Sequence, residues 1–425
     1  MAMIALEALW AHVKFSNRVA DAGGLTRPVY QLADAIASLN IGILSRIAAA
    51  FPRLLTLGLY ILVFQQYSLG PWNMNNPLAW VVALVMYDFL YYWKHRANHE
   101  VRIMWAGHIT HHNSEFFNLS TALRQSSTTF LFDWIFYLPM AILGIPPAMF
   151  VLVALIDLLY QFWVHTELIG KLGWFDRIFV SPSNHRVHHG QDDYCLDKNY
   201  GGILIIWDRL FGTYEDERDE PIVYGVRTQL ASVNPLWGNW HYYAIIWNDF
   251  LTAKGLAAKL DALIAPPVGW EGDKAEPFHP QHFQRYELNL ERRVIWYVLA
   301  QLALNVLAIS IFTFYFPKWE IWQSMIAGGG IAHWPLGAKF WAQVIPAISS
   351  ISIAYTLLRV RNGKQLWLGI FAIASLFASF GVALFMGPTS KALGIFSGTQ
   401  LLHYFLAIAL LLICLPNRTP ATNTQ

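Results

Sequence analysis

The sequence has few cysteines and few charged residues, and both shortages limit what the protein can be. Only two of its 425 residues are cysteine, Cys195 and Cys414, so neither a disulfide framework nor a thiolate zinc site is expected. Charged residues make up 13% of the chain against 56% hydrophobic residues, a composition typical of integral membrane proteins. The formal net charge is only +2 and no basic patch is interleaved with aromatic residues, so nucleic-acid binding is not expected.

Long apolar runs predict an all-α fold, a multi-pass transmembrane helical bundle of about eight spans. The runs lie near residues 52–70, 76–93, 128–145, 148–165, 294–316, 340–358, 365–386 and 393–415. Basic residues before the first span and after the second and fourth place those segments on the cytoplasmic face. We therefore predict an integral protein of a bacterial inner membrane or of the endoplasmic reticulum.

Three regions follow from this topology. Residues 1–51 are predicted to be an amphipathic or interfacial segment, and 52–290 a membrane domain with a cytoplasmic cap. Residues 291–425 are predicted to form a membrane domain of four spans. Within the cap, the aromatic-rich stretch from Trp237 to Trp247 predicts a helix at the level of the lipid headgroups.

Nine of the 15 histidines lie between His95 and His189, near the ends of apolar runs. Spacings of three and four residues put their side chains on one side of a helix. One zinc or iron ion is satisfied by about four to six donors, so this many imidazoles predict two ions held close together. The candidate ligands form three clusters and a single ninth residue at the end of the fourth span: His95 and His99; His108, His111 and His112; His185, His188 and His189; and His165.

Two acidic residues lie on the same helical stripes as candidate ligands. Asp88 precedes His95 by seven residues, and Asp157 precedes His165 by eight. Either carboxylate could accept the second ring N–H of a metal-bound histidine, or could instead cap or pair with a neighbouring helix. The pattern leaves both alternatives open.

The order HxxxH, HxxHH, HxxHH resembles the fatty acid hydroxylase and sterol desaturase superfamily. The residues that link the boxes resemble the alkylglycerol monooxygenase branch of that superfamily, over roughly residues 80–225. The matching stretches are 99–101, 105–108, 111–115, 118–125, 160–167, 185–190, 197–201 and 211–214. One departure is Gln161, four residues before His165, where some members carry a second histidine.

The resemblance implies a membrane-bound monooxygenase that uses two non-haem iron ions and O2, with tetrahydrobiopterin or another external reductant. The implied substrate is an alkylglycerol lipid, hydroxylated on the carbon next to the ether oxygen and released as a fatty aldehyde and a glycerol derivative. The eight box histidines are the implied iron ligands, with Glu100 a functional acid beside them. Residues that bind the reductant are not identified. Four polar residues of the matched loop could contact it or a headgroup, or could only cap helices: Glu115, Asn118, Arg124 and Gln125.

Two alternatives remain at this stage. The first keeps the di-iron site but makes the protein a fatty acyl, sterol or carotenoid hydroxylase or desaturase. The second is a metal transporter or scaffold, although transporters usually place ion ligands near the bilayer midplane. No glycine-rich nucleotide fingerprint is present, so an oxygenase would need an external electron donor besides its membrane lipid substrate.

Overall fold

The computed structural model of the protein describes residues 2–16, 18–20, 26–48, 50–267 and 278–286. The chain divides into Met1–Glu287 and Leu288–Gln425, and every described residue belongs to the first unit. The four predicted spans from residue 294 onward, and the predicted domain 291–425, lie outside the described residues. The predicted boundary at residue 51 stays a prediction.

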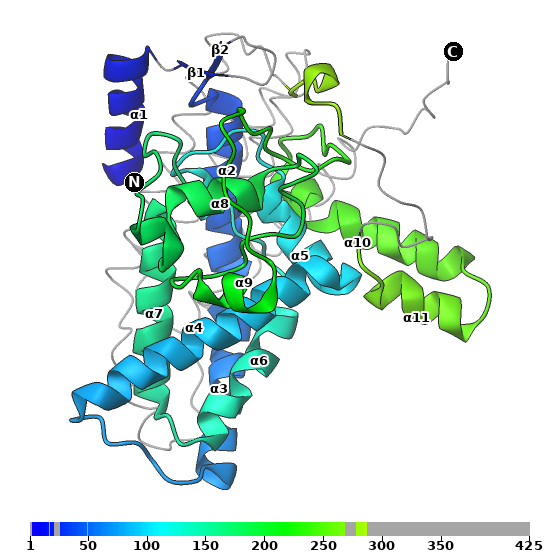
Figure 1. Ribbon diagram of the computed structural model, residues 1–425. Coiled ribbons are helices and arrows are strands. Elements are labelled where there is room, and N and C mark those ends of the chain that lie inside the picture. Colours follow the sequence, from blue (N-terminus) through cyan, green and yellow to red (C-terminus); the bar gives the residue numbers. More distant parts are fainter. Residues whose placement is uncertain (1, 17, 21–25, 49, 268–277, 287–425) are drawn as a thin grey trace, which may run out of the picture. The chain divides into compact units, whose positions relative to one another are not determined.

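The described part of the chain is mostly helical, which confirms the predicted helical class (Figure 1). It also contains a short antiparallel strand pair, β1 (Arg18–Ala20) with β2 (Thr26–Pro28). The α-helices are α1 (Ala2–Phe15), α2 (Leu32–Ala48), α3 (Ala50–Tyr67), α4 (Pro77–Glu100), α5 (Arg102–His112), α6 (Phe130–Ile142), α7 (Pro147–Trp163), α8 (Pro182–His189), α9 (Ile206–Phe211), α10 (Pro235–Thr252) and α11 (Leu256–Ile264). Short 3₁₀ turns are η1 (Thr121–Leu123), η2 (Phe175–Arg177) and η3 (Pro280–His282).

Helices α3, α4, α6 and α7 enclose the largest apolar core of this unit. Aromatic rings stack at its centre: Tyr60 lies on Phe150 with centroids 4.3 Å apart, and Tyr87 lies on Tyr137 at 4.5 Å. Each of the first four predicted spans overlaps one of these helices. Among the described helices, however, none combines the length and the apolar character that crossing a membrane would require.

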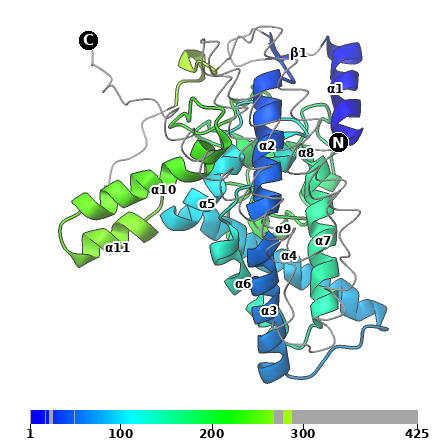
Figure 2. The same ribbon diagram turned by 180° about the vertical axis from the view of Figure 1, so that it is seen from behind.

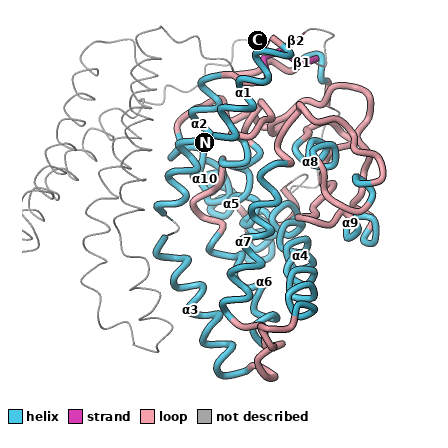
Figure 3. Tube along the Cα trace, turned by 90° about the vertical axis from the view of Figure 1, so that its left-hand side faces the viewer, coloured by secondary structure: helices cyan, strands magenta, loops and turns pink. Residues whose placement is uncertain are grey.

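Helices α2 and α3 follow each other along one line, with α6 and α7 beside α3 (Figures 2 and 3). Helices α10 and α11 form a hairpin that runs across this direction and packs on α5. Loops around α8 and α9 complete the part of the unit that carries the histidines.

Three helices begin at the same sequence signal, a polar capping residue followed by proline. Asn76 caps α4, Ser181 caps α8 and Asn234 caps α10, each side chain accepting a hydrogen bond from a backbone N–H of the first turn. The proline that follows has no N–H to leave unsatisfied, and its fixed φ suits the first helical position. At α8 the cap is reciprocal, because the Asn184 side chain also accepts from the Ser181 backbone N–H. Helix α8, which carries three histidines, is thereby fixed at its first turn.

Candidate metal centre

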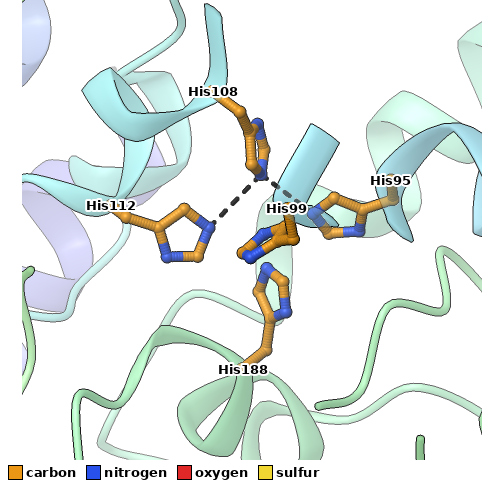
Figure 4. A group of neighbouring side chains, drawn as sticks. All are labelled: His95, His99, His108, His112 and His188. Carbon is orange, nitrogen blue, oxygen red and sulfur yellow. Dashed lines mark hydrogen bonds between the residues drawn. The ribbon is translucent and has the colours of Figure 1, made fainter. Parts of the chain in front are cut away.

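The structure brings all nine predicted histidines together in two adjacent groups. Within each group the candidate ligand atoms lie within 4.8 Å of one another. The five-histidine group contains His95, His99, His108, His112 and His188 (Figure 4). The four-histidine group contains His111, His165, His185 and His189.

Each HxxHH box divides its histidines between the two groups. On α5, His108 and His112 face the five-histidine group, whereas His111 faces the four-histidine group. On α8 the pattern is reversed, because only His188 reaches the five-histidine group. Successive helical residues point about 100° apart, so neighbouring histidines cannot serve one point equally well. The double histidine of each box therefore links the two histidine groups.

In the four-histidine group, two imidazoles face each other with unprotonated nitrogens. His111 Nδ1 donates to the Arg124 carbonyl at 3.0 Å, and His165 Nδ1 donates to the Gln161 carbonyl at 2.8 Å. A carbonyl oxygen only accepts, so both rings carry their proton on Nδ1 and a lone pair on Nε2. The two Nε2 atoms lie 3.2 Å apart, an unfavourable contact unless a cation lies between them. This arrangement fits a metal ion.

The five-histidine group has the same character. His95 Nδ1 donates to the Tyr200 carbonyl at 2.8 Å, and His188 Nδ1 donates to the Lys198 carbonyl at 2.9 Å, which leaves both Nε2 atoms unprotonated. His108 Nε2 lies 3.0 Å from His95 Nε2 and 3.2 Å from His112 Nε2. The Nε2 atoms of His99 and His188 are buried and have no hydrogen-bond partner among the described residues. These donors fit a second ion.

Burial keeps these imidazoles neutral, as metal ligands must be. It lowers the pKa of His111 to about 4 and that of His188 to about 3. Burial, with neighbouring imidazoles that disfavour a further positive charge, also lowers the pKa of His99, His108 and His112 well below the usual value. Neutral nitrogens gathered without protons can coordinate a cation at neutral pH.

The predicted contact between acidic residues and the ligands is not made. The Asp88 carboxylate accepts hydrogen bonds from the Ile203 and Leu204 backbone N–H groups, at 2.6 and 3.1 Å, and from the Trp207 indole at 2.8 Å. The Asp157 carboxylate accepts from the side chain of Gln161. Asp88 lies two helical turns from His95, about 10 Å along the axis, which is too far for a direct bond. Backbone carbonyls take the predicted role.

Glu100 lies outside both groups. Its carboxylate pairs with Arg96 at 2.8 Å, one turn back on α4, and its side chain is 40% exposed. An acidic residue that was not predicted lies closer to a ligand, since Asp197 Oδ1 is 3.8 Å from His99 Nδ1. Asp197 belongs to one of the stretches that carry the resemblance, but nothing in its residue type signals this position.

The polar residues of the loop after α5 mainly support structure. The Arg124 guanidinium pairs with Asp34 of α2 at 3.1 Å, and its carbonyl orients His111. Asn118 donates to the Val29 carbonyl at 2.9 Å, and Gln125 donates to the Ala122 carbonyl at 3.0 Å.

Residues 80–213, which carry all nine histidines, match the model of the family described as fatty acid hydroxylase. This segment of the chain is therefore similar to fatty acid hydroxylase domains, and the predicted resemblance to the superfamily is confirmed. Over a longer stretch than this segment, the chain is similar to the alkylglycerol monooxygenases of several animals, as the linking residues predict.

Three of these relatives illustrate the similarity. The human protein is 46% identical over 244 residues, which cover 57% of this chain and 54% of the relative. The Xenopus tropicalis protein is 44% identical over 56% of this chain and 52% of its own length. The Danio rerio protein is 43% identical over 58% of this chain and 55% of its own length. The chain thus spans about half the length of the curated relatives it matches, and no solved structure matches it.

Proposed function

We propose that the protein is a membrane-bound di-iron monooxygenase that hydroxylates the carbon next to the ether oxygen of alkylglycerol lipids. The observation that carries the proposal is the pair of adjacent histidine groups, whose unprotonated Nε2 atoms face one another inside the fold. The names of the similar animal proteins supply the substrate class. The nine histidines are the proposed iron ligands.

The proposed reaction balances with an external two-electron reductant. Bound iron supplies the activation of O2 that an unactivated C–H bond requires. One oxygen atom enters that C–H bond, and the other leaves as water with two protons and two electrons from tetrahydrobiopterin or another donor. The hydroxylated ether carbon is a hemiacetal, which breaks its C–O bond to release a fatty aldehyde and the free glycerol hydroxyl.

The chain's own residues bind the ions and hold the imidazoles in one tautomer. Loops and helices around the four-histidine group exclude water, since all four of its rings are buried. Glu100, at the end of α4 beside His99, is proposed as a functional acid at the more open side of the centre. The proposal does not include a hydrogen bond from a histidine ring to Asp88.

Exposed apolar side chains support a membrane location. On the outer faces of α4, α6 and α7, Leu78 is 64% exposed, Val81 57%, Ile135 52% and Leu159 64%. Soluble surfaces rarely expose so many large apolar residues on neighbouring helices. We propose that these outer faces contact the bilayer, with the histidines on the cytoplasmic face, and the set of about eight spans stays a prediction.

Aldehyde release tests the function. The full chain, purified and supplied with ferrous iron, a reduced pterin and a 1-O-alkylglycerol in air, is expected to form the matching fatty aldehyde. The His111→Ala, His188→Ala double variant is the control and should form none. No aldehyde, with hydroxylation of a fatty acyl lipid, sterol or carotenoid instead, would replace the proposed substrate. No lipid turnover by the wild-type chain, with metal bound, would favour a transporter or scaffold.

A further inference from the structure

Residues 197–204, here called the 197–204 loop, provide hydrogen-bond acceptors for two histidines of the five-histidine group. The Tyr200 carbonyl accepts from His95 and the Lys198 carbonyl accepts from His188, at 2.8 and 2.9 Å. The Asp197 carboxylate lies 3.8 Å from His99 Nδ1. One short loop thus faces three of the five imidazoles, and none of the four in the other group.

Two buried carboxylates hold this loop by its backbone. Asp208 of α9 accepts hydrogen bonds from Tyr200 N at 2.7 Å, Gly201 N at 2.8 Å and the Thr213 hydroxyl at 2.7 Å. Further along, Asp88 of α4 accepts from the backbone N–H groups of residues 203 and 204. Both carboxylates are essentially buried, with 0% and 1% exposure. A carboxylate that receives several N–H groups in a dry interior fixes the backbone firmly.

Asn199 ties the same loop to the helix that carries His188. Its side-chain amide donates to the Asn184 carbonyl of α8 at 3.0 Å and to the Glu215 carbonyl at 2.8 Å, and its oxygen accepts from Glu215 N at 2.9 Å. Asn199 adopts a left-handed conformation with φ 58, which asparagine tolerates better than most residues. The loop is therefore fixed from three sides, by α4, α8 and α9.

Glycine at two positions lets the loop approach its anchors. A Cβ on Gly202 would lie 2.7 Å from Asp157 Oδ1 and 2.9 Å from Asp88 Oδ1. A Cβ on Gly201 would lie 2.6 Å from the Leu204 carbonyl oxygen. The backbone of this loop passes directly between carboxylates of α4 and α7, which no larger residue would permit.

We propose that the 197–204 loop sets the metal affinity of the five-histidine group separately from the four-histidine group, with Asp208 and Asn199 as its positioning residues. The inference rests on the proposed function only in taking the two groups as iron sites. Hydrogen bonds to the outer nitrogen of a ligating histidine fix its tautomer and orientation, and their loss typically weakens metal binding 10- to 100-fold. Because the acceptors are backbone carbonyls, the loop can be loosened only through its anchors.

Iron retention in the full-length protein tests the inference. The protein is loaded with ⁵⁷Fe, dialysed against graded chelator, and followed by iron analysis and Mössbauer spectroscopy. In Asp208→Asn, one amide N–H₂ faces a backbone N–H, so we expect one of the two ions to be released at roughly 10- to 100-fold lower chelator concentration than in the wild type. The Mössbauer spectrum of the ion that stays bound should match that of His188→Ala, which lacks one ligand of the five-histidine group. It should differ from the spectrum of His185→Ala, which lacks one ligand of the four-histidine group.

Two further variants keep the result interpretable. Asn199→Gly tolerates the left-handed backbone but deletes the three side-chain hydrogen bonds, so it should also release the five-histidine ion first. Asp176→Asn is the matched control: Asp176 is a buried carboxylate that accepts a backbone N–H from Leu172 at 2.6 Å, and among the described residues its side chain makes no hydrogen bond with the loop. It should keep both ions.

Three results would overturn the inference: both ions retained as in the wild type, both lost together, or the four-histidine ion lost first. Failure of the proposed function is separate, since it would appear in the wild-type protein as absence of bound iron or of aldehyde release.

Discussion

The five-histidine and four-histidine groups are oriented by different parts of the chain. In the four-histidine group, His165 donates to a carbonyl of α7, the helix that ends just before it, and His111 donates to the loop that follows its helix α5. In the five-histidine group, His95 and His188 depend on a loop beyond α8 that carries no ligand itself. The first group is therefore oriented by chain segments that directly adjoin its own ligands, whereas the second depends on how a separate loop is anchored.

The two groups also differ in what surrounds them. Phe117 covers the four-histidine group, with ring centroids 5.1 Å from His189 and 5.6 Å from His165. Beside the five-histidine group, the Trp105 ring lies 4.9 Å from His99 and is only partly buried, and the Asp197 side chain is 48% exposed. We expect solvent and an external reductant to approach from the five-histidine side.

The largest effect should come from removing one ligand of each group. His188→Ala and His185→Ala should each lose the ion of their own group, because a weakened set of donors cannot hold the cation against chelator. Aldehyde formation should fall to background in both, since the proposed chemistry needs both ions. Iron analysis beside the activity assay checks this. Full activity in either single variant would show that only one group matters.

Acid should destabilise the iron-free protein through both groups. The folded-state pKa is lowered to about 4 for His111 and about 3 for His188, so the unfolded chain binds more protons below pH 6.5. The stability these histidines provide is complete above their unfolded pKa and is lost as pH falls through 6.5 toward the folded values. Each contributes a loss of about 1.4 kcal/mol per pH unit in that window. Chemical unfolding of the iron-free protein at pH 7 and pH 5.5 measures it, and equal stability at both would contradict the buried, neutral state.

Glu7→Gln should weaken the four-histidine group selectively. The Glu7 carboxylate of α1 is buried and accepts from the Thr166 hydroxyl, from Tyr30 and from the Leu119 backbone N–H at 2.8 Å. It thus joins the N-terminal segment to the residue that follows His165. Disturbing a buried hydrogen-bonded group of this kind costs about 1–3 kcal/mol. Chelator titration should show the four-histidine ion released earlier while the five-histidine ion is unchanged. Release of both ions at the same lowered chelator concentration would show that Glu7 does not support the four-histidine group selectively.

Gly202→Ala should loosen the 197–204 loop and so disturb the five-histidine group. The new methyl group would lie 2.7 Å from Asp157 Oδ1, and relief of such overpacking typically costs about 1–3 kcal/mol. Gly58→Ala in α3 is the matched control, since a Cβ there meets nothing within 4 Å. Replacing a helical glycine should stabilise the protein by up to about 1 kcal/mol. Thermal unfolding of both variants gives the comparison, and a stable Gly202→Ala variant with normal iron retention would mean that the loop is not tightly held.

The sequence was most informative where side chains carry the chemistry. Spacing and position predicted which nine histidines the structure gathers into the two groups, because the imidazole donor belongs to the residue type itself. The linking residues predicted the similarity to fatty acid hydroxylases. The division of each box between two groups depends on the register of α5 against α8, which spacing alone does not contain. The carbonyls of Lys198 and Tyr200 could not be predicted, since any residue supplies a carbonyl.

For Asp88, the sequence predicted the helical face correctly but also suggested a contact with an imidazole that the structure does not make. Its place on the same stripe as His95 is correct, but a shared stripe does not bring residues two turns apart into contact. It reaches the ligands only through the loop that it anchors. The short β1–β2 pair and the contacts of Glu7 also depend on partners far away in the sequence, for which the chain gives no local signal.

The most direct test of the account is the amount of iron bound by the full-length wild-type protein, measured by elemental analysis together with X-ray absorption. We predict two iron ions per chain, surrounded mainly by nitrogen at about 2.0–2.2 Å, as imidazole ligands would give. One ion or none after loading with ferrous iron, or a coordination shell without histidine nitrogen, would contradict the central claim.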